Sequence, residues 1–140
     1  MNWTKQHPGL AMFAAMIGLL LFLWGMAVPL SWAPDPIGQA AQQFAEGTRM
    51  TVLLTLISGT AGVVLGVLAG LGKLSSVPPL RWISEFYVWL IRGTPLLLQI
   101  LFVWLAVPTL LPDSMQISDF ACAAIALALN IGAYNAECVR

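Results

Sequence analysis

Long stretches without a charged residue divide this chain into four apolar segments joined by short polar connectors. The first covers Gly9–Ala33, about 25 residues, and the second covers Met50–Gly72. Each exceeds the roughly 20 residues that an α-helix needs to cross the hydrocarbon core of a bilayer. A third stretch extends to about Leu111, and a fourth covers Phe120–Tyr134. The pattern predicts an all-α integral membrane bundle with about four transmembrane helices.

The first stretch has two explanations, a membrane helix or a cleaved signal peptide. Lys5 precedes it, and Ser31, Trp32 and Ala33 resemble a small-residue cleavage site. The apolar region of a signal peptide is only about 7–15 residues long, however, which is shorter than this stretch. We therefore expect an uncleaved helix, with residues 1–43 forming this helix and an external connector.

The connector after the first stretch carries its own helix signal. Asp35 and Pro36 suit the N-cap and the first position of a helix. Ile37, Ala41 and Phe44 would then share one face. The spacing predicts a short helix lying on the membrane surface.

The second stretch has a small residue at every fourth position. On a helix these residues form one smooth stripe along which another backbone can approach closely. We expect this stripe to be a helix-packing face, and its members are Ser58, Gly62, Gly66 and Gly70.

The third stretch is interrupted by Arg92, Gly93, Thr94 and Pro95. Thr94 can cap a helix and Pro95 suits a first turn, so we expect a new helix from Pro95 to about Leu111. The aromatic-rich segment Trp82–Ile91 is then either an interfacial helix or the lower arm of a kinked one. The sequence leaves both possibilities open.

Three polar side chains within the apolar stretches are candidate functional residues: Gln99, Asn130 and Tyr134. An amide is expensive against lipid, so Gln99 and Asn130 should face protein or water. Two explanations remain, hydrogen bonding between helices and lining of a solute path. Glu137 shares the helical face of Asn130 and Tyr134, and we expect it to pair with Arg140 three residues later.

Composition excludes several classes of protein. Hydrophobic residues make up 59% of the chain and charged residues 9%, against roughly a quarter charged in soluble domains. Zero net charge argues against nucleic-acid binding. The single histidine, His7, and the absence of any metal-binding, P-loop or catalytic motif predict no metal, no bound cofactor and no enzyme activity.

Basic residues gather on one side of the predicted topology: Lys5, Lys73, Arg81 and Arg140, with Arg92 nearby. Only Arg49 falls on the other side. The positive-inside rule then places the N-terminus in the cytoplasm. We expect the long stem of Arg92 to reach water or lipid phosphate at the cytoplasmic face.

Three stretches, taken together, resemble the permease subunits of polar amino-acid ABC importers. They are F-A-E-G-T-R-M-T-V-L-L-T-L, R-G-T-P-L-L-L-Q and G-A-Y-N-A-E-C-V-R, at Phe44–Leu56, Arg92–Gln99 and Gly132–Arg140. The resemblance covers about two-thirds of the chain. The motif positions that match the family are Arg92, Gly93, Thr94, Pro95, Glu137 and Arg140.

The resemblance implies a multi-pass permease of the bacterial inner membrane with the type I ABC transporter fold. Its partners would be a second copy or a sister permease, an external solute-binding protein and a cytoplasmic ATPase, which would use the ATP. Residues 44–140 would be the N-terminal part of the transmembrane domain, ending before the segment that couples to the ATPase. The alternative is a helical membrane scaffold or anchor that does not transport and binds partners through its glycine stripe.

The predicted orientation can be tested with a single cysteine. In a variant carrying Ser75→Cys and no other thiol, we expect an impermeant maleimide to label the protein only after the cell membrane is opened, because the basic loop should be cytoplasmic. Labelling of intact cells would show that the orientation is inverted. A cysteine replacing Asp113, in a predicted external loop, is the control that should react from outside.

Overall fold

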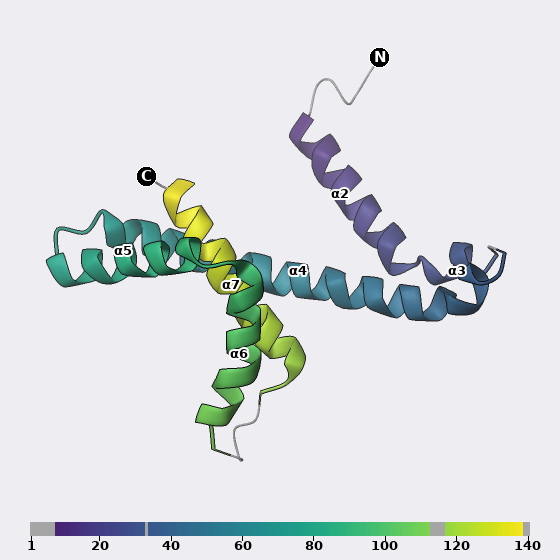
Figure 1. Cartoon of the computed structure of the whole chain (residues 1–140). Helices are drawn as coiled ribbons and strands as arrows, with labels where there is room; N and C mark the ends of the chain where they lie inside the picture. Colours follow the sequence, from purple (N-terminus) through teal and green to yellow (C-terminus); the bar gives the residue numbers. More distant parts are fainter. Residues whose placement is uncertain (1–7, 33, 113–116, 139–140) are drawn as a thin grey trace. The chain divides into compact units, whose positions relative to one another are not determined.

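The computed structural model describes residues 8–32, 34–112 and 117–138, and helices are the regular elements within these ranges. They are α2 (Pro8–Trp24), α3 (Ala27–Leu30), α4 (Ile37–Lys73), α5 (Pro78–Gly93), α6 (Leu96–Leu110) and α7 (Asp119–Cys138), shown in Figure 1. Both α4 and α7 are long and apolar enough to cross a membrane, and α5 with α6 form a bent pair that can supply a third span. The predicted all-α membrane fold is confirmed.

The chain divides into two units, Met1–Leu53 and Leu54–Arg140, and the division falls inside α4. In the first unit, α2 ends at Trp24, so the expectation of one helix over Gly9–Ala33 is wrong. Gly25 and Met26 form a turn before the four residues of α3. Pro29 explains the break, because it has no N–H to donate to the carbonyl of Gly25 and its ring would collide with that carbonyl.

Arg49 of α4 binds the end of α2. Its Nε donates a hydrogen bond of 3.1 Å to the carbonyl oxygen of Trp24, and its guanidinium lies 5.7 Å from the centre of a Trp24 ring. Trp24 is the last residue of α2, where helix carbonyls have lost their intrahelical donors. The arginine that stood apart in the predicted topology therefore caps α2 and stacks on its last side chain.

The short surface helix expected after Pro36 is also wrong. Residues 37–73 form one unbroken helix of 37 residues, α4, which is about 55 Å long at 1.5 Å per residue. Between its start and the apolar stretch there is no proline, and alanine and glutamine are good helix formers. Ala41 and Ala45 are buried on this part of the helix, while Phe44 is exposed.

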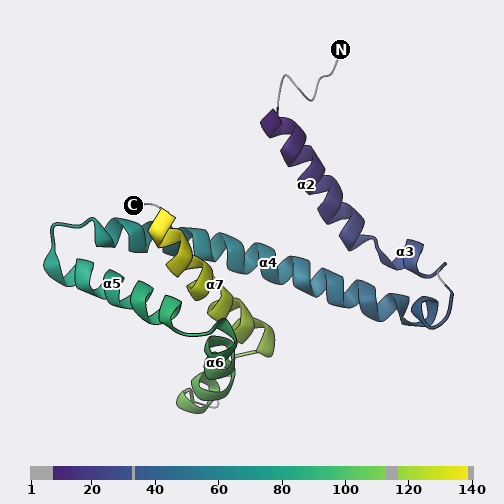
Figure 2. The same cartoon turned by 45° about the horizontal axis from the view of Figure 1, so that its top comes forward.

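In the second unit, the small-residue stripe of α4 lies against α7. Ser58 is 1% exposed, and Gly62, Gly66 and Gly70 are buried. A Cβ atom added at Gly62 would lie 2.6 Å from Cγ2 of Ile131, and one at Gly66 would lie 2.4 Å from Cβ of Asn135. Both distances are too short for real side chains, so the two backbones cross where only glycine fits (Figure 2).

The third apolar stretch forms two helices, and α6 turns by 106° from the direction of α5 (Figure 1). The aromatic-rich segment before the bend is therefore a separate helix, α5, and both predicted alternatives, an interfacial helix and the lower arm of a bent span, are compatible with this angle. Tyr87 of α5 ties it to α7, because its hydroxyl donates a hydrogen bond of 2.6 Å to the carbonyl of Leu129.

Helix α6 packs on α7 through a small apolar cluster. Val103, Cys122 and Ala126 are buried in it, at 7%, 1% and 1% exposure. A hydrogen bond also joins the two helices, because Nε1 of Trp104 in α6 donates one of 2.8 Å to Oδ1 of Asp119 in α7. Asp119 is the first residue of α7, where a negative charge also favours the helix dipole.

The close crossing of α4 and α7 predicts a specific response to one added methyl group. Gly66→Ala should lower the unfolding temperature in detergent, because the new Cβ overlaps Cβ of Asn135 and overpacking costs about 1–3 kcal/mol. Gly59→Ala is the matched control on the same helix, since nothing lies within 4 Å of its added Cβ. We expect that control to leave stability unchanged or slightly raised. Equal unfolding temperatures for the two variants would contradict the observed crossing.

Candidate functional site

The bend between α5 and α6 leaves a backbone carbonyl without its usual hydrogen-bond donor. In a continuous helix the carbonyl of Ile91 would accept a hydrogen bond from the N–H of residue 95. Residue 95 is proline and has no N–H. In apolar surroundings a carbonyl without a donor costs several kcal/mol, so another group must supply the missing hydrogen bond.

Gln99 supplies that donor. Its side-chain Nε2 lies 2.6 Å from the carbonyl oxygen of Ile91, 2.9 Å from the carbonyl oxygen of Thr94 and 2.9 Å from the hydroxyl of Thr94. The amide has two hydrogens for three acceptors, so one is shared between two of them. Gln99 is 9% exposed, which makes it one of the few buried polar side chains described.

Thr94 closes the end of α5 and does not cap α6, so the predicted role of this residue is wrong. Its hydroxyl donates a hydrogen bond of 3.0 Å to the carbonyl of Leu90, one turn earlier. The N-cap position of α6 is occupied by Pro95, which makes no side-chain cap. The predicted start of a new helix here is confirmed, with α6 beginning at Leu96.

Asn130 of α7 holds Gln99 in place. Its Nδ2 donates a hydrogen bond of 3.2 Å to Oε1 of Gln99. The carbonyl end of the Gln99 amide is thereby fixed, which leaves its nitrogen directed at the bend. The structure brings together the two amides that the sequence singled out, and they bond to each other across α6 and α7.

Arg92 is held from α7 on the other side of the bend. Its Nη1 lies 3.7 Å from Oε2 of Glu137, and its guanidinium lies 5.4 Å from the centre of the Tyr134 ring. Its side chain is 44% exposed. Arg92 thus has an ionic and an aromatic partner on a single helix, and its predicted reach to lipid phosphate or water stays a prediction.

Glu137 carries a second ion pair, with Lys73 at the end of α4. Glu137 thus contacts a cation on each of two other helices, and the expected pairing with Arg140 lies outside the described residues. Lys73 is the residue of this site that sequence reasoning missed. The two partners are 64 positions apart, and no local spacing connects them.

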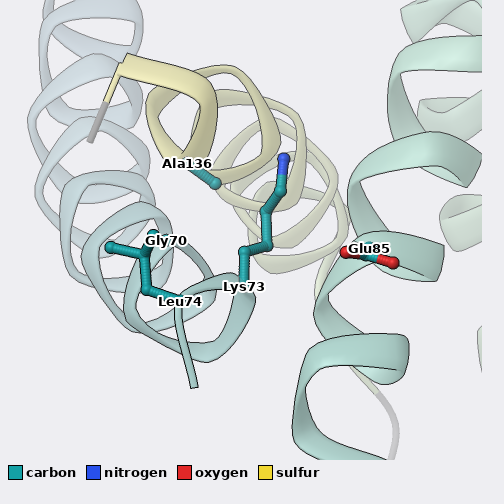
Figure 3. Close-up of a pocket in the computed structure, with 5 residues that line it drawn as sticks. All are labelled: Gly70, Lys73, Leu74, Glu85 and Ala136. Carbon is teal, nitrogen blue, oxygen red and sulfur yellow. The ribbon is translucent and has the colours of Figure 1, made fainter. Parts of the chain in front are cut away.

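A hollow opens beside this ion pair. Its volume is about 360 Å³, and it is lined by Gly70, Lys73, Leu74, Glu85 and Ala136 (Figure 3). A neighbouring hollow of about 350 Å³ is lined in part by Lys73, Glu85, Arg92 and Glu137. Two basic and two acidic side chains therefore share one region where the ends of α4, α5 and α7 meet.

Residues of α5, α6 and α7 at the bend line a larger, mostly apolar groove. Its volume is about 690 Å³, and Thr94 and Gln99 are the polar residues in its lining, among side chains such as Phe102 and Ile125. Asn130 is partly buried and Tyr134 is 53% exposed. Among the described residues, no group of three or more possible metal ligands occurs.

No family model matches the chain, but curated relatives do. The arginine transport system permease protein of Bacillus subtilis is 40% identical over 95 residues, which are 68% of this chain and 42% of that protein. The L-cystine transport system permease protein of the same organism is 38% identical over 94 residues, 67% of this chain and 39% of that protein. The chain thus spans less than half the length of the curated relatives it matches.

A solved structure gives the same result. A crystal structure of an amino acid ABC transporter with histidines matches with a TM-score of 0.58 and 39% identity, covering 63% of this chain and 40% of that chain. The resemblance to the permease subunits of amino-acid ABC importers, predicted from the motifs, is confirmed.

The role of Gln99 at the bend predicts a loss of stability on removal of its amide. Gln99→Met keeps the length of the side chain but leaves the carbonyls of Ile91 and Thr94 without this donor, at a cost of about 1–3 kcal/mol. We expect a lower unfolding temperature in detergent or lipid nanodiscs. Leu97→Met, at an exposed position on the same helix, is the control that should be neutral. If both variants melt together, Gln99 is not needed to satisfy the bend.

Proposed function

Because about 68% of the chain is similar to permease subunits of amino-acid transport systems, we propose that it belongs to the transmembrane permease subunit of an ATP-driven importer of polar amino acids. The importer would lie in the bacterial inner membrane with the N-terminus of this subunit in the cytoplasm. The observation that carries the proposal is the combination of this similarity with a buried polar centre at a helix bend. Broken helices with satisfied backbone groups are typical of transport sites near the middle of a membrane.

Three residues form the proposed solute path: Gln99, Asn130 and Tyr134. Gln99 uses its amide nitrogen on the bend and its oxygen on Asn130, so we assign it the role of orienting Asn130. Asn130 is partly buried and Tyr134 is 53% exposed on the same face of α7, and we propose that both would meet the solute directly. An amide beside a phenol suits hydrogen bonding to a polar solute without fixing its charge.

The substrate class rests on the relatives. One is named for arginine transport and another for L-cystine transport, and both solutes are polar amino acids. The shared α-ammonium and α-carboxylate groups are the chemistry that we propose for the solute of this chain.

The proposed partners follow from what transport requires. Alternating access needs two bundles around a central site, which a second copy of this subunit or a sister permease would provide. A cytoplasmic ATPase would use the ATP, and an external solute-binding protein would deliver the amino acid. ATP can drive transport only if the ATPase interacts differently with the inward and outward states of the permease.

Asn130→Ala tests the solute path. In the protein made from the complete natural reading frame, with its ATPase and binding protein in proteoliposomes, we expect uptake of the radiolabelled amino acid to fall about tenfold. That is the effect of losing one hydrogen bond of about 1.4 kcal/mol to the solute. Asn135→Ala makes the same chemical change on the side of α7 that faces Gly66, and it should keep most of the uptake.

Two measurements decide the outcome. Substrate-stimulated ATP turnover by the wild-type assembly supports an importer, whereas turnover that no amino acid changes would reject the proposed function. The membrane level of each variant is measured by quantitative immunoblot. If Asn130→Ala lowers that level as much as it lowers uptake, Asn130 supports the fold and does not line the path.

A further inference from the structure

One face of α7 holds the bend at two points. Asn130 binds Gln99, which lies in α6 after the bend. One and two turns further along α7, Tyr134 and Glu137 hold Arg92, which lies in α5 before the bend. Seven residues separate Asn130 from Glu137, about 10 Å along a helix. Beside Asn130, the carbonyl of Leu129 accepts a hydrogen bond of 2.6 Å from the hydroxyl of Tyr87, which ties α5 to the same part of α7. The angle between α5 and α6 is therefore set at two places on α7.

The two contacts differ in strength. At Gln99 the hydrogen bonds are 2.6–3.2 Å long, and the side chain is 9% exposed. At Arg92 the nearest charged atoms are 3.7 Å apart, and the arginine side chain is 44% exposed. Half-exposed ion pairs contribute little to stability, whereas buried hydrogen bonds are costly to leave unmade. If either contact opens in the folded protein, it is the one at Arg92.

If the contact between Arg92 and Glu137 opened, Glu137 would still have a positively charged partner. Lys73 also pairs with Glu137, so the carboxylate keeps a cation when the guanidinium leaves. Arg92 borders the same hollow as Glu85, a second carboxylate that it can face after leaving Glu137. Glu85 already pairs with Arg81 at 4.0 Å, and both of these side chains are about half exposed, so this ion pair contributes little stability and exchanging it costs little.

We propose that Arg92 is a positioning residue that latches the bend. Gln99 and Asn130, together with the hydrogen bond from Tyr87 to Leu129, form the pivot about which α5 turns relative to α6 and α7 during transport. Breaking and remaking the contact of Arg92 with Tyr134 and Glu137 accompanies each turn. This proposal rests on the proposed function, because it assigns the moving part of that permease. Interconversion between two discrete arrangements is what an alternating-access protein requires.

A reversible cross-link tests the latch without altering it. Trp89→Cys places a thiol on α5 at a side chain that is 70% exposed and borders the hollow shared with Glu137. The partner thiol is the native, exposed Cys138, next to Glu137 on α7, while Cys122 is buried. Short bis-methanethiosulfonate reagents of two lengths would join the two thiols, intact mass would verify the link, and reducing agent would remove it.

We expect linking in the assembled transporter to lower amino-acid uptake at least tenfold and reduction to restore it. The same variant with Cys138→Ser cannot be linked and is the matched control, whose uptake the reagent should leave unchanged. Uptake that continues in the verified linked protein overturns the latch while leaving the importer intact. Absence of uptake before linking, in a wild-type assembly as well, counts instead against the proposed function.

Arg92→Met gives an independent readout. A latch that only stabilises the fold would lower the unfolding temperature and the membrane level of this variant. The proposed latch predicts a nearly unchanged unfolding temperature, because the pivot holds, together with a several-fold rise in ATP turnover in the absence of amino acid. Arg92→Lys keeps the charge and should restore part of the normal dependence on substrate. A fall in stability without a change in that dependence would overturn the proposal.

Discussion

A proline that cannot donate a hydrogen bond determines the arrangement of the second unit. Because Pro95 has no N–H, the carbonyl of Ile91 needs a donor from elsewhere, and apolar surroundings offer no water to provide it. Gln99 supplies the donor, and Asn130 holds Gln99. The sharp turn between α5 and α6 therefore depends on α7 lying against it.

Several of the few charged residues join helices that are distant in the sequence. The chain has only six basic and six acidic residues, yet Lys73, Arg92 and Glu137 meet at one point in the second unit. In the first unit, Arg49 caps and stacks on the end of α2. Ion pairs at partly exposed positions add little stability each. Their value here is positional, because each joins helices that are distant in the sequence.

The sequence predicted the features that depend on composition and on neighbouring residues. Apolar length identified the membrane helices, and Pro95 identified the start of α6. The sequence did not show that α2 would end at Trp24, because an apolar run conceals a break caused by Pro29 four residues after Gly25. The sequence also did not show that the short helix expected after Pro36 would continue into the membrane helix as α4. Helix-forming residues run from one to the other with no signal that ends a helix. The partners of Arg92 and Glu137 come from other helices, and a single sequence carries no signal of such distant pairing.

The glycine crossing between α4 and α7 has a geometric consequence for the whole second unit. At Gly62 and Gly66, α4 has no side chains, and Ile131 and Asn135 of α7 occupy the space beside them, so α7 fits against α4 in one rotation about its own axis. A turn of α7 by one residue, about 100°, would replace Ile131 and Asn135 beside these glycines by other side chains. That rotation also determines which residues of α7 point toward the bend. The glycines of α4 therefore determine how α7 is rotated about its own axis. Asn130, Tyr134 and Glu137 reach their partners because the crossing with α4 fixes that rotation.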